Sequence, residues 1–181
     1  MVTNTKEDAK VKENLKTEGP EVAEEELEGL STLEQADKIV RNFVLWSAGG
    51  GLIPMPLADI AAIYAAQVTM IAKLSKVYDI PFSEHKFKNT LFPLFASLGV
   101  VPMGTGLLAS MVKIVPGVGQ LVSGLSMPVM AGAITYATGK VFTSHFEAGG
   151  TLLDFNPETM KDYYKELFEK GKTVAKEAAS S

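Results

Sequence analysis

One stretch of the sequence decides which folds this chain can adopt. Residues 89–139 read NTLFPLFASLGVVPMGTGLLASMVKIVPGVGQLVSGLSMPVMAGAITYATG. These fifty-one residues contain one formal charge, Lys113, which separates an uncharged run at 89–112 from a second one at 114–139. Each run exceeds the roughly 18 to 20 residues with which a helix crosses the roughly 30 Å hydrocarbon layer of a bilayer. The pattern predicts two long apolar helices that form a membrane-inserted hairpin.

Proline and glycine residues interrupt both runs. In a membrane they are tolerated where neighbouring helices satisfy the freed backbone groups, so we expect kinked helices that pack against protein. An alternative breaks each run into two shorter helices of an all-α core and covers the surplus apolar surface by oligomerisation. The glycines of the second run that we expect at helix-packing or oligomer contacts are Gly117, Gly119, Gly124 and Gly132.

Two further helices are expected before this stretch. Ser31 with Glu34 is a capping box, which begins a helix over 31–48, and a glycine- and proline-rich turn precedes a second helix over 56–78. The uncharged portions of both helices are too short to cross a bilayer, which favours a partial hairpin or two helices on the membrane surface. Small residues recur at every fourth position of the second helix and permit close approach of another backbone: Ala58, Ala62 and Ala66.

Polar residues in these apolar surroundings are candidates for function. Asp59 is the only charge between Arg41 and Lys73. It either stabilises the positive N-terminal end of its helix or is an intramembrane carboxylate with an ion or proton role. A channel or transporter built from broken helices would line its path with Asp59, Gln67 and Lys113, which we name as candidate intramembrane polar residues.

A lysine-rich loop follows the second helix. Four lysines flank residues 79–83: Lys73, Lys76, Lys86 and Lys88. Beside apolar segments this pattern favours a loop on the cytoplasmic face, although an ordinary solvated loop between soluble helices gives the same pattern. We expect Ser83 to cap the helix that comes next.

The C-terminal part has a soluble character. Asn156 followed by Pro157 predicts the start of an amphipathic helix over 156–170, which ends before Gly171 and lies on the cytoplasmic side. A packed helix of this kind contacts the rest of the protein or a partner.

The charges are concentrated at the N-terminus. Up to Lys38 the chain carries 11 acidic residues and 5 lysines, and Arg41 is its single arginine, which excludes nucleic-acid binding. We interpret residues 1–30 as an acidic mobile tail, or alternatively as an acidic partner-binding arm. Residues 31–178 then form a single helical membrane-associated domain with an apolar core over 39–140. The N-terminus lacks the pattern of a secretory signal, so we expect membrane entry to use the internal segments.

The sequence shows no recognisable chemical site. There is no cysteine, and His85 and His145 are the only histidines. The Gly-Lys pairs at 139–140 and 171–172 lack the rest of a phosphate loop. We therefore expect no catalytic residue, no cofactor and no metal site.

Several segments resemble the uncharacterised bacterial domain family of the YcjF type, over about residues 36–172. The resemblance implies association with the bacterial inner membrane and a GTPase partner, since members are often fused or adjacent to Era-like GTPases. It supplies no catalytic residue, and this chain departs from the fused members in having no GTPase domain. The similar segments are IPMPLAD (53–59), QVTMIAKLSKVY (67–78), KIVPGVG (113–119), TYATG (135–139) and KELFEKG (165–171).

These observations together predict an all-α, helical membrane-associated bundle with two long kinked apolar hairpin helices and a partial first hairpin. We expect a non-enzymatic inner-membrane protein with both termini in the cytoplasm. It contacts the lipid bilayer, forms a homo-oligomer through its glycine- and alanine-rich segments, and serves as scaffold or anchor for a cytoplasmic GTPase partner. The alternatives are an ion channel or transporter, and a soluble oligomeric helical bundle without lipid contact.

Overall fold

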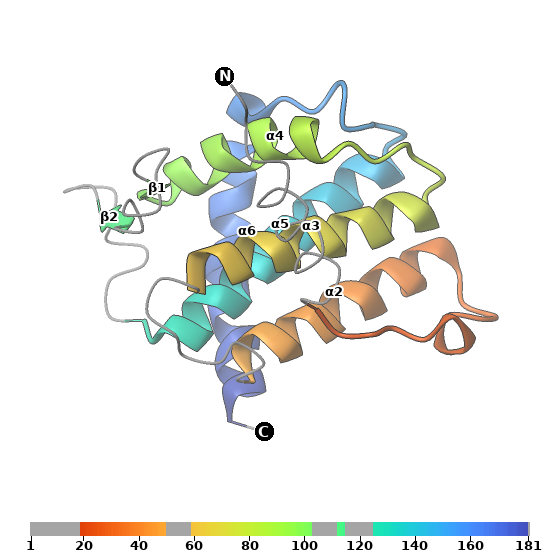
Figure 1. Cartoon of the computed structure of the whole chain (residues 1–181), viewed down its shortest axis with the longest axis horizontal. Helices are drawn as coiled ribbons and strands as arrows, with labels where there is room; N and C mark the ends of the chain where they lie inside the picture. The colour runs from red at the N-terminus through yellow and green to blue at the C-terminus, as the bar shows by residue number, and fades with distance from the viewer. Residues whose placement is uncertain (1–18, 50–58, 103–111, 115–124, 181) are drawn as a thin grey trace, which may run out of the picture.

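The structure, a computed structural model, describes residues 19–49, 59–102, 112–114 and 125–180. Its short elements are the 3-10 turn η1 (Glu24–Glu26) and the strands β1 (Val100–Pro102) and β2 (Val112–Ile114). Its α-helices are α2 (Thr32–Ala48), α3 (Asp59–Val77), α4 (Glu84–Ser97), α5 (Met127–Glu147) and α6 (Pro157–Ala179) (Figure 1). The two strands form one antiparallel pair with Val101 opposite Lys113. The all-α class is confirmed for the described residues, apart from this short pair.

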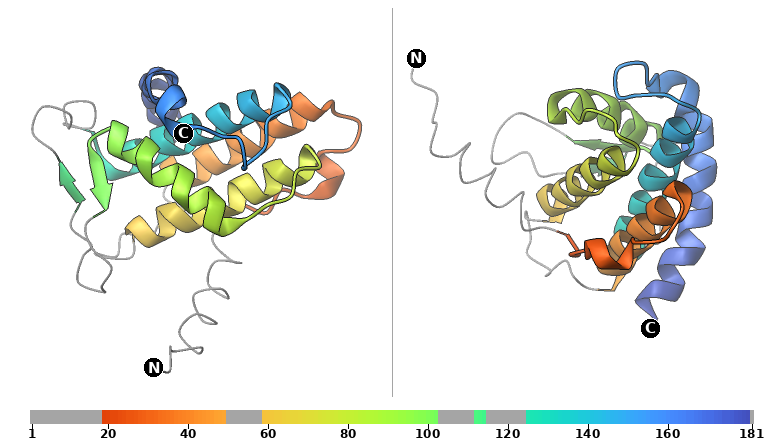
Figure 2. Two further views of the ribbon diagram at one scale, coloured as in Figure 1. Left: turned by 90° about the horizontal axis from the view of Figure 1, so that it is seen from above. Right: turned by 90° about the vertical axis from the view of Figure 1, so that its right-hand side faces the viewer.

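The helices form a bundle with one crossing member. Helices α3 and α5 run in one direction, α2 and α4 run in the opposite direction, and α6 lies across them (Figures 1 and 2). Helix α5 contacts α2, α3 and α6, and α6 also contacts α4 and α2. Helix α5 is therefore the central element of the bundle.

Helix α5 is buried on all sides. Its buried residues lie all round the helix: Val129, Ala131, Gly132, Ala133, Ile134, Thr135, Ala137, Thr138, Gly139, Val141, Phe142, Thr143 and Phe146. A helix that is apolar all round is buried either in the core of a protein or in lipid. Here three other helices of the same chain cover it.

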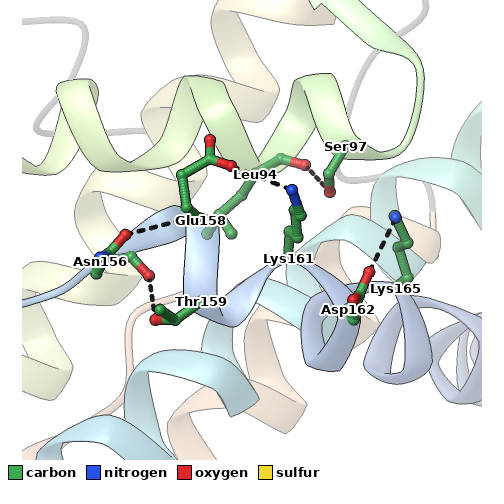
Figure 3. Close-up of polar contacts among 8 residues, drawn as sticks. All are labelled: Leu94, Ser97, Asn156, Glu158, Thr159, Lys161, Asp162 and Lys165. Carbon is green, nitrogen blue, oxygen red and sulfur yellow. Dashed lines mark hydrogen bonds and ion pairs between the residues drawn. The ribbon is translucent and has the colours of Figure 1, made fainter.

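Two predicted helix starts are confirmed. The Ser31 hydroxyl accepts a hydrogen bond from the Glu34 amide, and the Glu34 carboxylate accepts one of 2.8 Å from the Ser31 amide, which completes the capping box of α2. Asn156 accepts a 3.0 Å hydrogen bond from the Glu158 amide at the start of α6, as Figure 3 shows. Ser83 stands at the N-cap of α4 as expected, but its side chain makes no capping hydrogen bond.

The prediction that the last helix ends before Gly171 is wrong. Helix α6 continues through this glycine to Ala179. A Cβ at Gly171 would lie 2.8 Å from the carbonyl oxygen of Ala133, so the missing side chain lets α6 approach α5 closely. Glycine inside a helix costs about 1 kcal/mol relative to alanine, and the close packing on α5 offsets that cost.

The prediction of two long apolar hairpin helices over 89–112 and 114–139 is also wrong for the parts of these two runs that the structure describes. The first run leaves the helical conformation after Ser97, because Gly99 takes a φ of 80° that turns the chain into β1. The second run begins in β2, and its helical part is the N-terminal portion of α5. The intervening residues 103–111 and 115–124 lie outside the described part. Within the described ranges, no helix combines the length and apolar character needed to cross a bilayer.

Part of the predicted tail packs on the bundle. Val22 is buried against the core, and the Lys38 ammonium donates a 2.9 Å hydrogen bond to the carbonyl of Glu26. Residues 19–30 therefore belong to the packed structure, because the few apolar residues among these glutamates reach the core. Residues 1–18 lie outside the described part.

Candidate functional site

The segments that connect the helices differ in charge between the two ends of the bundle. The C-terminus of α2, the N-terminus of α3, the C-terminus of α4 with the strand pair, and the N-terminus of α5 all lie at one end (Figures 1 and 2). The segments that leave and re-enter there, 49–58 and 98–126, contain no charged residue except Lys113. We call this end of the bundle, as defined by those four termini, the apolar end.

The connecting segments at the opposite end carry charged residues. This end consists of the N-terminus of α2, the α3–α4 connection at 78–83 and the α5–α6 connection at 148–156 (Figure 1). We call it the charged end. The charged residues in or beside these segments include Lys76, Asp79, Glu84, Lys86, Glu147 and Asp154. The charge segregation seen along the sequence thus becomes a difference between the segments that connect the helices at the two ends, while the charged last turns of α6 lie beside the N-terminus of α5.

The candidate packing residues fall in different places. Ala66 is fully buried on α3. A Cβ at Gly132 would lie 2.8 Å from the Cβ atoms of both Ala48 and Ala175, so this glycine stands where α2, α5 and α6 of one chain meet. Ala62 belongs to α3, but its side chain is not described. Four other candidates lie outside the described residues: Ala58, Gly117, Gly119 and Gly124.

The three candidate intramembrane polar residues come from different parts of the structure. Asp59 is the first described residue of α3, and Lys113 lies in β2; both belong to the apolar end, and neither side chain is described. Gln67 lies inside the packed core with none of its surface exposed. Its amide donates a 2.9 Å hydrogen bond to the Thr135 hydroxyl of α5.

A small polar cluster surrounds that contact. The hydroxyls of Ser47 and Thr135 lie 3.1 Å apart, so Ser47, Gln67 and Thr135 connect α2, α3 and α5. Among the described residues, the amide oxygen of Gln67 has no hydrogen-bond partner. Sequence analysis missed Ser47 and Thr135 because isolated hydroxyl residues in an apolar run give no signal of which helices will meet.

The two histidines do not form a common site. His85 lies on α4 within 3.4 Å of Asn89. The His145 ring lies at the end of α5, where Nε2 is 3.0 Å from the carbonyl oxygen of Thr151 and 3.7 Å from Asp154. Hydrogen bonds from Thr151, and to a smaller extent the nearby His145, lower the pKa of Asp154. Over the described ranges, no three acidic or imidazole side chains are grouped as ligands for a metal.

Burial also affects the tyrosines. The Tyr164 hydroxyl lies 3.1 Å from that of Thr138 in the core, and burial raises its pKa. Burial raises the pKa of Tyr78 as well, together with a hydrogen bond that its hydroxyl donates to Glu147. These groups stay neutral near physiological pH and act as structural hydrogen-bonding groups.

Comparison with known proteins places the chain in a family. Residues 20–173 match the model of a domain of unknown function, DUF697. Magnetosome membrane protein 22 of Magnetospirillum gryphiswaldense is 42% identical over 142 residues, which cover 77% of this chain and 72% of that protein. No solved structure matches the chain. The matched residues cover the described helical bundle except Gly19 and the last part of α6. The chain therefore belongs to the DUF697 family.

Proposed function

We propose that this chain is a non-enzymatic, helical, membrane-associated protein that contacts the bilayer through its apolar end and presents its charged end to a partner. The observation that carries the proposal is that the described ends of α2, α3, α4 and α5 that flank the uncharged sequences 49–58 and 98–126 lie at one end of the bundle. The similarity to a magnetosome membrane protein supports a membrane as the site of action.

The physical basis is the exclusion of charge from these two segments. Transfer of apolar surface out of water contributes about 25 cal/mol per Å². Lys113 is compatible with an interfacial position, because a lysine can extend its aliphatic chain along apolar surroundings and keep its ammonium group in water. Contact through one end of a bundle needs no helix that crosses the bilayer.

Two of the five exposed large apolar residues of the described part stand at the apolar end, while Leu33, Leu153 and Tyr163 lie elsewhere. Leu45 in the last turn of α2 and Met127 in the first turn of α5 are 41% and 46% exposed, and both stand at the apolar end. Both side chains provide exposed apolar surface at this end.

The partner and the oligomeric state complete the proposal. The lysines around the α3–α4 connection favour a charged end that faces the cytoplasm, which fits the bacterial inner membrane. The resemblance to the YcjF type favours a GTPase as partner, and the chain then serves as its scaffold or anchor. Self-association through the glycine- and alanine-rich segments is part of this proposal, and light scattering on the purified protein measures it.

Flotation with lipid vesicles tests the membrane contact. We expect the full chain to float with vesicles, and we expect Met127→Glu combined with Leu45→Glu to reduce the floated fraction at least severalfold, because burying a carboxylate in the interface is unfavourable. Leu153→Glu is the matched control, since Leu153 is 73% exposed in the α5–α6 connection of the charged end. A wild-type chain that stays with the soluble fraction, or equal flotation of the two variants, contradicts the proposal.

A further inference from the structure

Helix α3 carries three of the four buried side-chain polar atoms that lack a hydrogen-bond partner in the described part of the chain. They are the hydroxyls of Tyr64 and Ser75 and the amide oxygen of Gln67, and the fourth is the hydroxyl of Thr143 on α5. Solvent does not reach these atoms in the packed bundle. Each of them has therefore lost its hydrogen bonds to water without a replacement, which costs free energy.

The three side chains lie on one face of α3, because residues three, eight and eleven positions apart point in similar directions. This face meets α5, where the Gln67 amide donates its 2.9 Å hydrogen bond to Thr135. Ser75 and Thr143 each stand eight positions further along their helices, and α3 and α5 run in the same direction (Figure 1). They therefore lie at the same level of the interface, yet their hydroxyls make no bond with each other. The contact between α3 and α5 is incompletely satisfied.

Glycines bring the helices α2, α5 and α6 into close contact with one another. A Cβ at Gly139 of α5 would lie 2.6 Å from Cγ2 of Val40 on α2. The close approaches at Gly132 and Gly171 join α5 to α2 and α6 in the same way. These three helices form a tightly packed unit, and α3 lies against it.

Apolar burial and two hydrogen bonds keep α3 in place in water. Ile63, Met70 and Leu74 recur at helical spacing beside the polar face and are buried. Their exposure to water is unfavourable, so the bundle stays closed in solution. The bonds Gln67–Thr135 and Tyr78–Glu147 add to this attachment. A lipid surface removes the largest restraint, because it accommodates the apolar side chains that water does not.

We propose that α3 is a detachable helix, which separates from α5 while α2, α5 and α6 stay together, and that a lipid surface stabilises the separated arrangement. The lipid step rests on the proposed membrane contact. Separation gives the three unpartnered atoms of α3 access to water, and the apolar side chains of the helix then contact lipid. The equilibrium shifts because lipid contacts these apolar side chains in the separated arrangement and not in the closed one.

Amide hydrogen exchange of the full chain in buffer tests the separation. We expect the amides of α3 to exchange through a partial opening, at least tenfold faster than those of α5. Tyr64→Phe combined with Ser75→Ala removes two unpartnered hydroxyls, which stabilises the closed bundle and should slow the exchange of α3 at least tenfold. Thr138→Val combined with Tyr164→Phe is the matched control, because it removes two hydroxyls that lie 3.1 Å apart and partner each other. This control should not slow the exchange of α3.

Spin labels test the lipid step. The chain contains no cysteine, so introduced cysteines are labelled specifically. Lys73→Cys with Ser144→Cys places one label on α3 and one on α5, and Ser144→Cys with Glu166→Cys places the labels on α5 and α6. With lipid vesicles we expect a longer distance between the first pair of labels and an unchanged distance between the second pair.

Three results would overturn the proposal. The first is equal exchange of the α3 and α5 amides in buffer, and the second is unchanged exchange of α3 in the Tyr64→Phe, Ser75→Ala variant. The third is an unchanged distance between α3 and α5 in a chain that floats with vesicles. A chain that does not float refutes the proposed membrane contact and the lipid step together, and the exchange in buffer then still decides whether α3 separates.

Discussion

The hydroxyl of Tyr78 donates a 2.6 Å hydrogen bond to Oε1 of Glu147. These residues stand just after the end of α3 and at the end of α5, sixty-nine positions apart in the sequence. The bond joins the two parallel helices at the charged end, and the Gln67–Thr135 hydrogen bond joins them again inside the core. Side-chain bonds therefore fix the register between α3 and α5.

Substitutions at Thr135 and at Gln67 in the core polar cluster should differ in their effect on the free energy of unfolding. Thr135→Val removes the hydroxyl that both Gln67 and Ser47 contact, and leaves buried polar groups without that partner. We expect a loss of about 1 to 3 kcal/mol in the free energy of unfolding. Gln67→Met keeps the Ser47–Thr135 contact and removes an amide oxygen that lacks a partner within the described structure. It should change stability by less than about 1 kcal/mol. Urea denaturation measures both, and a larger loss for Gln67→Met would refute this account.

Close packing at Gly132 predicts a cost for the smallest possible side chain. In Gly132→Ala the added methyl would lie 2.8 Å from the Cβ atoms of Ala48 and Ala175, neither of which can rotate away. We expect a loss of about 1 to 3 kcal/mol from overpacking, despite the better helix propensity of alanine. The exposed neighbour variant Lys176→Ala should stay within about 0.5 kcal/mol of the wild type in thermal and urea denaturation. Unchanged stability of Gly132→Ala would show that the three helices do not meet this closely.

The buried tyrosines predict alkaline unfolding. Burial raises the pKa of Tyr64 to about 12, and it is also the main cause of the raised pKa values of Tyr78 and Tyr164. The unfolded chain releases these protons near pH 10, whereas the folded chain retains them. The neutral tyrosines therefore contribute fully to the free energy of unfolding below about pH 10, and this contribution is lost as the pH rises through 12. Melting temperatures between pH 8 and pH 12 measure this. Tyr164→Phe removes one of these ionisations and should make the decline shallower; a melting temperature that is constant up to pH 12 would contradict the assignment.

The capping box of α2 should contribute measurably to stability. Ser31→Ala removes the hydroxyl that accepts from the Glu34 amide, and we expect a loss of about 1 kcal/mol in the free energy of unfolding. The exposed Thr32→Ala next to it makes no capping contact of this kind and serves as the control. Equal stability of both variants in urea denaturation would show that the start of α2 frays.

The local features of the fold were predictable because they depend on residues close together in the chain. The capping box at Ser31 and the cap at Asn156 each involve partners within three positions, and both are confirmed. The end of the last helix was not predictable in the same way. Gly171 reads as a helix stop by itself, and only its contact with Ala133 explains why α6 continues. The members of the core polar cluster also come from separate helices, so no local pattern indicates them.

The sequence by itself determined the starts of α2 and α6 and the separation of charged from uncharged segments. Only the tertiary structure decided what surrounds the apolar residues of α5, because a helix buried among other helices and a helix in lipid carry the same all-round apolar pattern. The tertiary structure also decided that the uncharged segments leave the bundle at one end, since that depends on the directions in which α2, α3, α4 and α5 pack. Packing between helices depends on contacts between residues that are far apart in the sequence, so a local sequence pattern does not determine it.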